Sequence, residues 1–307
     1  MHLTMSGGLY GITLSTLNED GTVDEGAFIQ EMALSFDTDV DGIVICGSTS
    51  EFIYLEEEQA FQMAEIASIT AAAAFETSGI KKILIGGASA PTEHKVIRMV
   101  EKLSDLGFSQ VLICPPYYFP QKKEDILTFY QEIDKHIPTG MGMLLYHIPS
   151  CAPGIDLSIL PQLMELPSVT GMKDSSGDML YHARARYISN KVGKLLFTGH
   201  DICFLPSQAV GGDGCMSAGA LLLNKLHNRL MYAYKKGDML EAQRLHSFLL
   251  ALDAKLNQVP FPENYRLLAQ ARKLYPGKAQ RRFSCLREDK KVLWLNEVEA
   301  LLARFYK

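Results

Sequence analysis

The chain has 307 residues, of which 47% are apolar and 21% are charged, a balance typical of a soluble globular protein with a large core. Its net charge of −5 and the lack of any basic run argue against nucleic acid as the main partner. No stretch of about 18 apolar residues occurs, which argues against a membrane span. Residues 1–9 lack the pattern of a signal peptide, so we expect a cytoplasmic protein.

Short apolar runs of strand length alternate with longer amphipathic stretches along most of the chain. Most runs are continuously apolar, as in strands buried on both faces, and do not alternate apolar with polar residues. The predicted strands are residues 9–14, 42–46, 82–86, 110–114, 142–148, 169–172, 194–198 and 214–217. The helices predicted between them include residues 24–35, 56–74, 94–106, 123–136 and 179–190.

Eight strands, each followed by a helix, form a parallel sheet that can close into a (β/α)8 TIM barrel. An open doubly wound sheet has the same local pattern, and the count of eight favours the barrel. With residues 221–235 as the eighth helix, the barrel domain is expected to span residues 1–235. Residues 236–307 are expected to form a C-terminal helical extension. Its predicted helices are residues 239–256, 265–274 and 292–305, and its predicted joint is the proline-containing segment 258–262.

The cysteines and histidines show no disulfide or metal-binding pattern. Six cysteines occur without a CxxC pair, and eight histidines occur without HExxH or HxH. We expect reduced thiols and no metal, although ligands gathered from distant segments would escape this test. The cysteines are Cys46, Cys114, Cys151, Cys203, Cys215 and Cys285.

In such barrels the active site lies at the C-terminal ends of the strands, where Lys173 directly follows the predicted strand 169–172. A buried ammonium group is costly, and few structural roles need one there. An amine in apolar surroundings keeps more of its free form at neutral pH, and a free amine attacks a ketone to form a Schiff base. The alternative is an ion pair with Asp174 or Asp178, and this residue alone supports both interpretations equally.

The second predicted strand, residues 42–46, is followed by Gly47, Ser48 and Thr49. The segment from Ser48 to Glu51 fits an S/T-x-x-E capping box. Such a box has a purely structural role. A helix start at the barrel mouth also presents free N–H groups, however, and two hydroxyls beside them favour the binding of a substrate carboxylate.

Tyrosines follow two further strands. Tyr146, in the fifth strand, is either a core aromatic residue or a proton shuttle for imine formation and carbon–carbon cleavage. Tyr117 and Tyr118, after the fourth strand, allow the corresponding pair of roles, rim packing or a relay to Tyr146.

Together these residues resemble the dihydrodipicolinate synthase / N-acetylneuraminate lyase family of class I aldolases, from Gly8 to about Asn224. Several family motifs occur in the correct order on successive strand ends. The matching segments are residues 15–21, similar to T-P-F-x-x-D-G; 47–51, matching G-[ST]-T-G-E; 116–118, matching P-[YF]-Y; 146–149, matching Y-N-[IVP]-P; and 171–178, matching G-[IVM]-K-[DEQ]-[ST]-[ST]-G-[DN].

The resemblance implies a role for each conspicuous side chain. Lys173 would form the imine and Tyr146 would be the acid/base. Ser48 and Thr49 would hold the carboxylate of a 2-keto acid. Tyr118 would complete the proton relay from a neighbouring subunit, which implies a homo-oligomer, a dimer or a tetramer. The covalent imine through Lys173 leaves no need for a cofactor or a metal.

The resemblance also distinguishes between activities. Dihydrodipicolinate synthases usually carry an arginine where this chain has Cys151, and sialic acid lyases usually carry an acidic residue where it has Ile202 and a serine near Ala218. We therefore expect a third activity, the retro-aldol release of pyruvate from a 2-keto-3-deoxy sugar acid. The residues expected to line the rest of the pocket are Gly199, His200, Asp201, Met216 and Ser217.

Two functions of other classes stay open. The glycine-rich residues 211–214 (Gly-Gly-Asp-Gly) suit a phosphate-binding barrel isomerase or synthase, although a plain turn explains them as well. The departures from the family motifs at Thr16, Ser50 and His147 also suit a member that has lost catalysis and acts as a binding or regulatory protein.

Overall fold

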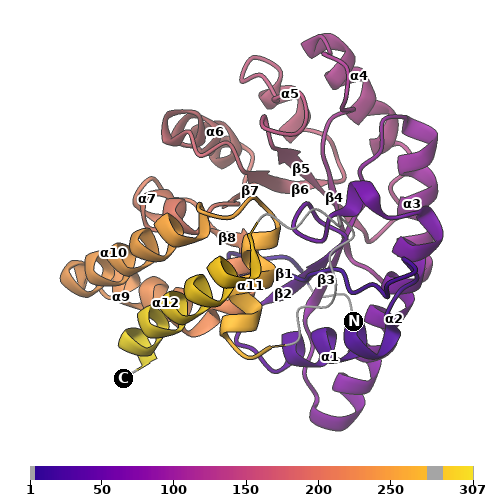
Figure 1. Cartoon of the computed structure of the whole chain (residues 1–307). Coiled ribbons are helices and arrows are strands. Elements are labelled where there is room, and N and C mark those ends of the chain that lie inside the picture. Colours follow the sequence, from indigo (N-terminus) through magenta and orange to yellow (C-terminus); the bar gives the residue numbers. More distant parts are fainter. Residues whose placement is uncertain (1–3, 275–285, 307) are drawn as a thin grey trace. The chain divides into compact units, whose positions relative to one another are not determined.

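The computed structural model describes residues 4–274 and 286–306, and within them eight strands form a closed parallel barrel in chain order (Figure 1). The strands are β1 (Gly8–Ile12), β2 (Gly42–Ile45), β3 (Ile83–Gly87), β4 (Gln110–Ile113), β5 (Gly142–His147), β6 (Val169–Asp174), β7 (Leu195–Thr198) and β8 (Gly214–Ser217). This topology confirms the predicted barrel and excludes the open doubly wound sheet.

Helices follow the strands around the barrel, and further helices form the C-terminal part. The helices up to residue 235 are α1 (Glu25–Phe36), α2 (Glu57–Ser78), α3 (Glu93–Asp105), α4 (Lys123–Asp134), α5 (Leu160–Met164), α6 (Met179–Lys191), α7 (Phe204–Ala209), α8 (Ala218–Leu222) and α9 (Asn224–Lys235). Those after it are α10 (Met239–Leu256), α11 (Glu263–Ala271) and α12 (Glu288–Tyr306). The predicted eighth helix is thus divided at Leu223. No helix in the described ranges is long and apolar enough to cross a membrane.

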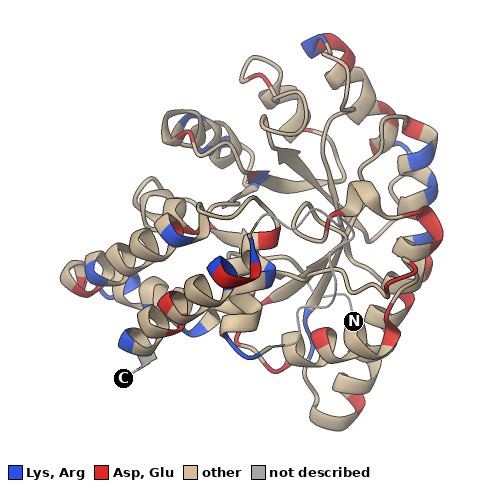
Figure 2. Ribbon diagram, in the orientation of Figure 1, with Lys and Arg blue, Asp and Glu red and all other residues tan. Residues whose placement is uncertain are grey.

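The strands consist almost entirely of apolar and small residues because both of their faces are buried. Every residue of β2, β3, β4 and β5 is buried. Most of the charged residues lie on the helices and loops (Figure 2). In the eight described strands only Lys173 and Asp174, at the end of β6, are charged. Because a buried charge is costly, these two residues require a specific explanation.

Two compact units contain these elements. The first comprises residues 1–10, 41–44 and 81–217 and carries β3 to β8 with α3 to α7. The second comprises residues 11–40, 45–80 and 218–307 and carries α1, α2 and α8 to α12. The predicted domain boundary at residue 235 stays a prediction.

In the first unit, β1 meets both of its neighbours through close backbone contacts. Leu9 N donates a hydrogen bond of 2.8 Å to the Asp41 carboxylate, and Asp41 N donates one of 2.8 Å to Leu9 O. A Cβ atom on Gly214 of β8 would lie 1.9 Å from Gly8 O. Only glycine at position 214 therefore allows β8 to approach β1 this closely.

In the second unit, the C-terminal helices pack against one another and against α8 and α9. α12 contacts α10 and α11, and α11 also contacts α8. The buried Trp294 of α12 donates from Nε1 to Lys255 O over 3.0 Å, and Lys255 Nζ pairs with Glu297 over 2.6 Å. The predicted joint at residues 258–262 connects α10 to α11.

Candidate active site

Lys173 lies on β6 beside Tyr146 on β5, in the parallel register that pairs these two residues. Its side chain is buried, with 2% of the residue exposed. Lys173 Nζ donates to Tyr146 Oη over 3.3 Å and lies 4.3 Å from the centroid of the tyrosine ring. Within the described residues the amine has no carboxylate partner. A buried amine whose hydrogen-bond partner is a phenol suits nucleophilic attack better than structural ion pairing.

The alternative of a strand-end ion pair is wrong, because both nearby carboxylates have other partners. Asp174 accepts hydrogen bonds from His182 and from Ser176 N, at 2.9 Å each. Asp178 caps the N-terminus of α6 by accepting from Leu180 N and Tyr181 N. Neither aspartate is bonded to Lys173.

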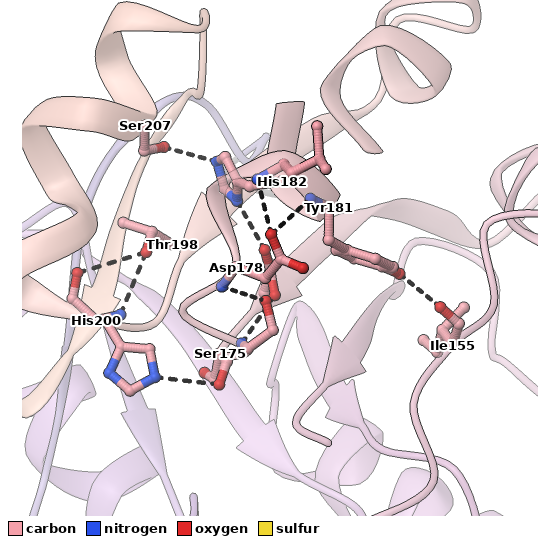
Figure 3. Close-up of polar contacts among 11 residues, drawn as sticks. Ile155, Ser175, Asp178, Tyr181, His182, Thr198, His200 and Ser207 are labelled. Atoms are coloured by element: carbon pink, nitrogen blue, oxygen red, sulfur yellow. Dashed lines mark hydrogen bonds and ion pairs between the residues drawn. The ribbon is translucent and has the colours of Figure 1, made fainter. Parts of the chain in front are cut away.

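A buried chain of polar groups joins Asp174 of β6 to His182 of α6 and Ser207 of α7 (Figure 3). The Asp174 carboxylate lies 2.9 Å from His182 Nδ1, and His182 Nε2 lies 2.8 Å from Ser207 Oγ. Burial opposes ionisation of Asp174, but the hydrogen bonds from His182 and Ser176 outweigh it and keep the pKa of this carboxyl below its ordinary value. Ser207 is fully buried, so this chain supports the end of β6 and does not present a nucleophile to substrate.

Gly199, at the end of β7, packs directly against the lysine side chain. Its N–H donates to Asp174 O over 2.7 Å. A Cβ atom at this position would lie 2.9 Å from Lys173 Cε and 1.9 Å from Ser175 Oγ. Gly199, predicted as a substrate contact, therefore makes room for Lys173 and Ser175.

The remaining predicted pocket residues gather at the ends of β7 and β8. Ser217 Oγ donates to Asp201 Oδ1 over 2.5 Å, and Met216 is fully buried. His200 is exposed, and its Nε2 donates to Ser175 O over 3.1 Å (Figure 3). Asp201 and Ser217 thus form a polar pair in the first unit, the unit that also contains Lys173.

The departure at His147 is accommodated by its surroundings. His147 Nδ1 accepts a hydrogen bond of 2.9 Å from Ile155 N, and its ring stacks on Tyr181 with the centroids 4.0 Å apart. Burial lowers the pKa of His147 against the opposing charges of Asp174 and Asp178. The imidazole is therefore a neutral acceptor, and the turn after β5 keeps a satisfied polar side chain.

The residues after β4 and β5 differ widely in exposure. Tyr118 is 87% exposed, has a positive φ of 85°, and meets Phe119 edge to face. Tyr117 is half-buried, and burial raises its pKa to about 12. Cys151 is exposed, and the four other cysteines in the described ranges are buried; all five are free thiols, whereas Cys285 lies outside those ranges.

The 47–51 loop, in the second unit, does not form the expected capping box. A single 3-10 turn, Phe52–Tyr54, follows it, and α2 begins later with its own capping box between Glu56 and Gln59. Ser50 Oγ instead donates to Thr13 O over 2.6 Å. Because α2 starts beyond the loop, the argument from a helix N-terminus does not apply, while Ser48 and the buried Thr49 remain candidates for carboxylate binding.

Arg266 of α11 connects the 47–51 loop to residues near the start of the chain. The guanidinium pairs with Glu51 Oε2 at 2.9 Å and also donates to Ser15 O and Ser15 Oγ. Glu31 lies near this charge and accepts from Leu14 N over 3.2 Å. The sequence patterns did not identify four buried polar residues, namely Arg266, Glu31, His182 and Ser207. Of these, only Arg266 could have been noticed, as a charged residue within an apolar stretch of a predicted helix.

The phosphate-site interpretation of residues 211–214 is wrong. This segment precedes β8, whereas barrel phosphate sites form in the loops that follow strands. The Asp213 carboxylate accepts from Arg186 at 2.7 Å and from Leu196 N at 2.8 Å. A fixed carboxylate in the loop also repels a phosphate.

Comparison with known proteins gives consistent matches over most of the chain. The model of the dihydrodipicolinate synthetase family matches residues 5–295. An uncharacterized DapA-like lyase of Pyrobaculum arsenaticum is 31% identical over 251 residues, which cover 80% of this chain and 78% of the relative. A 4-hydroxy-tetrahydrodipicolinate synthase of Thermodesulfovibrio yellowstonii is 29% identical over 278 residues, or 89% of each chain.

Solved structures show the corresponding fold. The crystal structure of a dihydrodipicolinate synthase from Bacillus anthracis superposes with a TM-score of 0.86 at 20% identity, covering 97% of this chain and 99% of that one. At this level of identity the likeness establishes the barrel and its helical extension.

The Asp174–His182 pair predicts a strong energetic coupling. The substitution His182→Ala leaves a buried carboxylate without its partner and is expected to lower the free energy of unfolding by about 3 kcal/mol. Adding Asp174→Ala to that variant should cost little more, because the group left unpaired is then gone. Urea unfolding at neutral pH measures this cycle, and losses that simply add would show that the two side chains do not interact.

The buried Glu31 predicts a pH-dependent stability. Burial raises its pKa to about 7, although the Leu14 N–H and Arg266 oppose the rise, whereas an unfolded glutamate has a pKa of about 4.3. Between these values only the folded chain holds the proton, so this group makes stability fall as pH rises. Relative to wild type, Glu31→Gln should gain about 2–3 kcal/mol between about pH 5 and about pH 8. Urea unfolding of wild type and Glu31→Gln across that pH range measures this difference. If the free energies of unfolding of the two proteins changed with pH in parallel, the prediction would be contradicted.

Proposed function

The chain belongs to the dihydrodipicolinate synthetase family, and from this membership we propose that it is a class I aldolase whose Lys173 forms a Schiff base with a 2-keto acid. Members of this family are lyases and aldolases. The observation that carries the proposal is the buried Lys173 amine, which is 2% exposed and bonded to Tyr146 Oη at 3.3 Å. A lysine with only a structural role at this strand end would be paired with a carboxylate.

The chemistry follows from an amine beside a phenol. Lys173 Nζ attacks the C2 carbonyl carbon of the keto acid, and loss of water leaves a protonated imine. Tyr146 Oη transfers the protons of this dehydration and then accepts the proton of the C4 hydroxyl as the C3–C4 bond breaks. The electron pair of that bond moves into the imine to give an enamine, and the aldehyde leaves. Protonation at C3 and hydrolysis then release pyruvate and restore the lysine.

The 47–51 loop is proposed to bind the carboxylate of the keto acid. Gly47, Ser48 and Thr49 match the family's loop residue by residue, and Ser48 and Thr49 supply two hydroxyls. Ser50, which departs from the family pattern, has a structural partner in Thr13 O. The departures at Ser50 and His147 therefore leave the loop and the turn after β5 intact, which favours an active enzyme over a catalytically inactive binding protein.

The substrate is proposed to be a 2-keto-3-deoxy sugar acid. Asp201 and Ser217, 2.5 Å apart, offer a carboxylate and a hydroxyl to the hydroxyl groups of a sugar chain. Lysine-biosynthetic condensation is the second candidate, favoured by the 29% identical synthase but opposed by Cys151, which offers no positive charge for a second carboxylate. Sialic acid cleavage is opposed by Ile202 and Ala218.

A second copy of the chain is the proposed partner. Tyr118 is 87% exposed and held at a positive φ of 85°, an uncommon conformation for a bulky residue. Because strained positions of this kind cluster at functional sites, the tyrosine suits insertion into a neighbouring subunit's proton relay.

Borohydride trapping tests the imine. Incubation with pyruvate and borohydride is expected to raise the intact mass by one reduced pyruvate in wild type and in the control Lys191→Ala, which removes an exposed lysine. The Lys173→Ala variant should gain nothing, because it lacks the amine proposed to form the adduct.

The same trapping experiment distinguishes the alternatives. Absence of an adduct in wild type with pyruvate and with other 2-keto acids would exclude the aldolase and leave a binding protein. If the adduct forms, release of pyruvate from 2-keto-3-deoxy sugar acids should exceed the condensation of pyruvate with aspartate 4-semialdehyde. The reverse ranking would identify a synthase.

Subunit complementation tests the role of Tyr118. Tyr118→Phe and Lys173→Ala are each expected to be nearly inactive, but unfolding them together and refolding the mixture should restore activity. In a mixed oligomer the lysine of the first variant meets the tyrosine of the second. If the mixture stays as inactive as its components, Tyr118 does not act across subunits.

A further inference from the structure

Arg266 is among the largest fully buried side chains of the protein, and it comes from α11, far along the chain from the loop it contacts. Within the second unit its guanidinium bonds to Glu51 Oε2 at 2.9 Å, to Ser15 O at 2.9 Å and to Ser15 Oγ at 3.0 Å. The side chains of Arg266 and Glu51 are each only 2% exposed. One planar cation therefore fixes two segments at once.

Glu51 needs such a contact because of its backbone conformation. It is a non-glycine residue at φ 56° and ψ 34°, in the left-handed region, which costs energy for a residue with a Cβ atom. No side-chain capping bond from Glu51 to the turn that follows supports this conformation. The Glu51 side chain is instead paired with Arg266.

The conformation of Glu51 is transmitted directly to the residues proposed to bind the carboxylate. Glu51 N donates to Ser48 O over 3.0 Å, and Phe52 N donates to Gly47 O over 3.4 Å. Ser50 Oγ is anchored to Thr13 O, two residues before Ser15. Backbone hydrogen bonds thus close the loop on itself, and two contacts attach it to residues 13–15. The first is the bond from Ser50 to Thr13, and the second runs through Arg266, which bonds to both Glu51 and Ser15.

From this arrangement we propose that Arg266 is a positioning residue that holds the 47–51 loop in its substrate-binding shape. This inference rests on the proposed function, in which that loop binds the keto acid carboxylate. The C-terminal extension then sets the affinity for the keto acid without contributing a group to the chemistry. Glu31 is the second acidic residue near the guanidinium. Its carboxyl group accepts a hydrogen bond from Leu14 N and so supports the segment that carries Ser15.

The inference separates binding from chemistry. A less rigid 47–51 loop is expected to bind the carboxylate more weakly. The hydrogen bond between Lys173 and Tyr146, both in the first unit, should be unchanged. Arg266→Lys keeps the positive charge but loses the planar fork that bonds Glu51 and Ser15 together. The pyruvate concentration that gives half of the maximal borohydride adduct should rise about tenfold or more, while the maximal adduct stays the same.

Arg272→Lys is the matched control. Arg272 caps the other end of α11, and its guanidinium donates to Leu222 O over 2.7 Å, also within the second unit. This control removes an equivalent fork from the same helix without touching the 47–51 loop. It should keep the half-saturating pyruvate concentration of wild type, even if its melting temperature falls as far as that of Arg266→Lys.

Glu51→Gln is a second test that does not depend on the folding of Arg266→Lys. Glutamine keeps the shape and one acceptor but loses the charge that fixes Arg266, so the half-saturating concentration should rise less, in the same direction. If Arg266→Lys and Glu51→Gln both kept the half-saturating pyruvate concentration of wild type, the inference would be overturned. A lower maximal adduct at an unchanged half-saturating concentration would also overturn it. No adduct in wild type at any pyruvate concentration would instead refute the proposed function.

Discussion

The placement of one amine in an apolar barrel is the constraint on which the rest of the structure depends. Lys173 is charged only at a cost in this core, and its one hydrogen-bond partner in the described chain is a phenol. The side chains around it fit that arrangement. Gly199 leaves room for the lysine stem, and Asp174, the neighbour of Lys173 on β6, is hydrogen-bonded to His182 of α6. The neighbouring carboxylate therefore has partners of its own and does not pair with the lysine.

Each of the two units contains one buried network with charged members. In the first unit, the chain from Asp174 through His182 to Ser207 fixes the end of β6, and Asp174 O and Oδ1 also accept from Gly199 N and Ser176 N. In the second unit, Arg266 fixes Glu51 and Ser15. Each network holds a segment that is proposed to touch substrate. Some residues of the family motifs, such as Ser15 and Glu51, thus make structural contacts in this chain, here with Arg266.

The barrel and the burial of Lys173 at a strand end could be predicted from the sequence because each has a local signal. Continuous apolar runs mark strands buried on both faces, and Lys173 stands out as a cation at the end of one. The networks could not be predicted, because their members lie 8 to 251 positions apart, and a charged residue in an apolar helix stretch, as at Arg266, does not identify its partners. The capping-box expectation failed for a related reason: Ser50 and Glu51 have tertiary partners, Thr13 and Arg266, that outweigh the local pattern. The substrate could be predicted only by analogy, from Cys151 and Ile202, where the chain differs from the usual family pattern.

The central claim is that the Lys173 amine is the group that bonds covalently to a keto acid. Peptide mapping of the wild-type protein after borohydride reduction with pyruvate tests this claim most directly, because it locates the adduct without relying on a substitution. The account predicts one modified position, Lys173, at pyruvate concentrations that leave every other lysine unmodified. An adduct spread over exposed lysines such as Lys191, or one at a different single lysine, would contradict it.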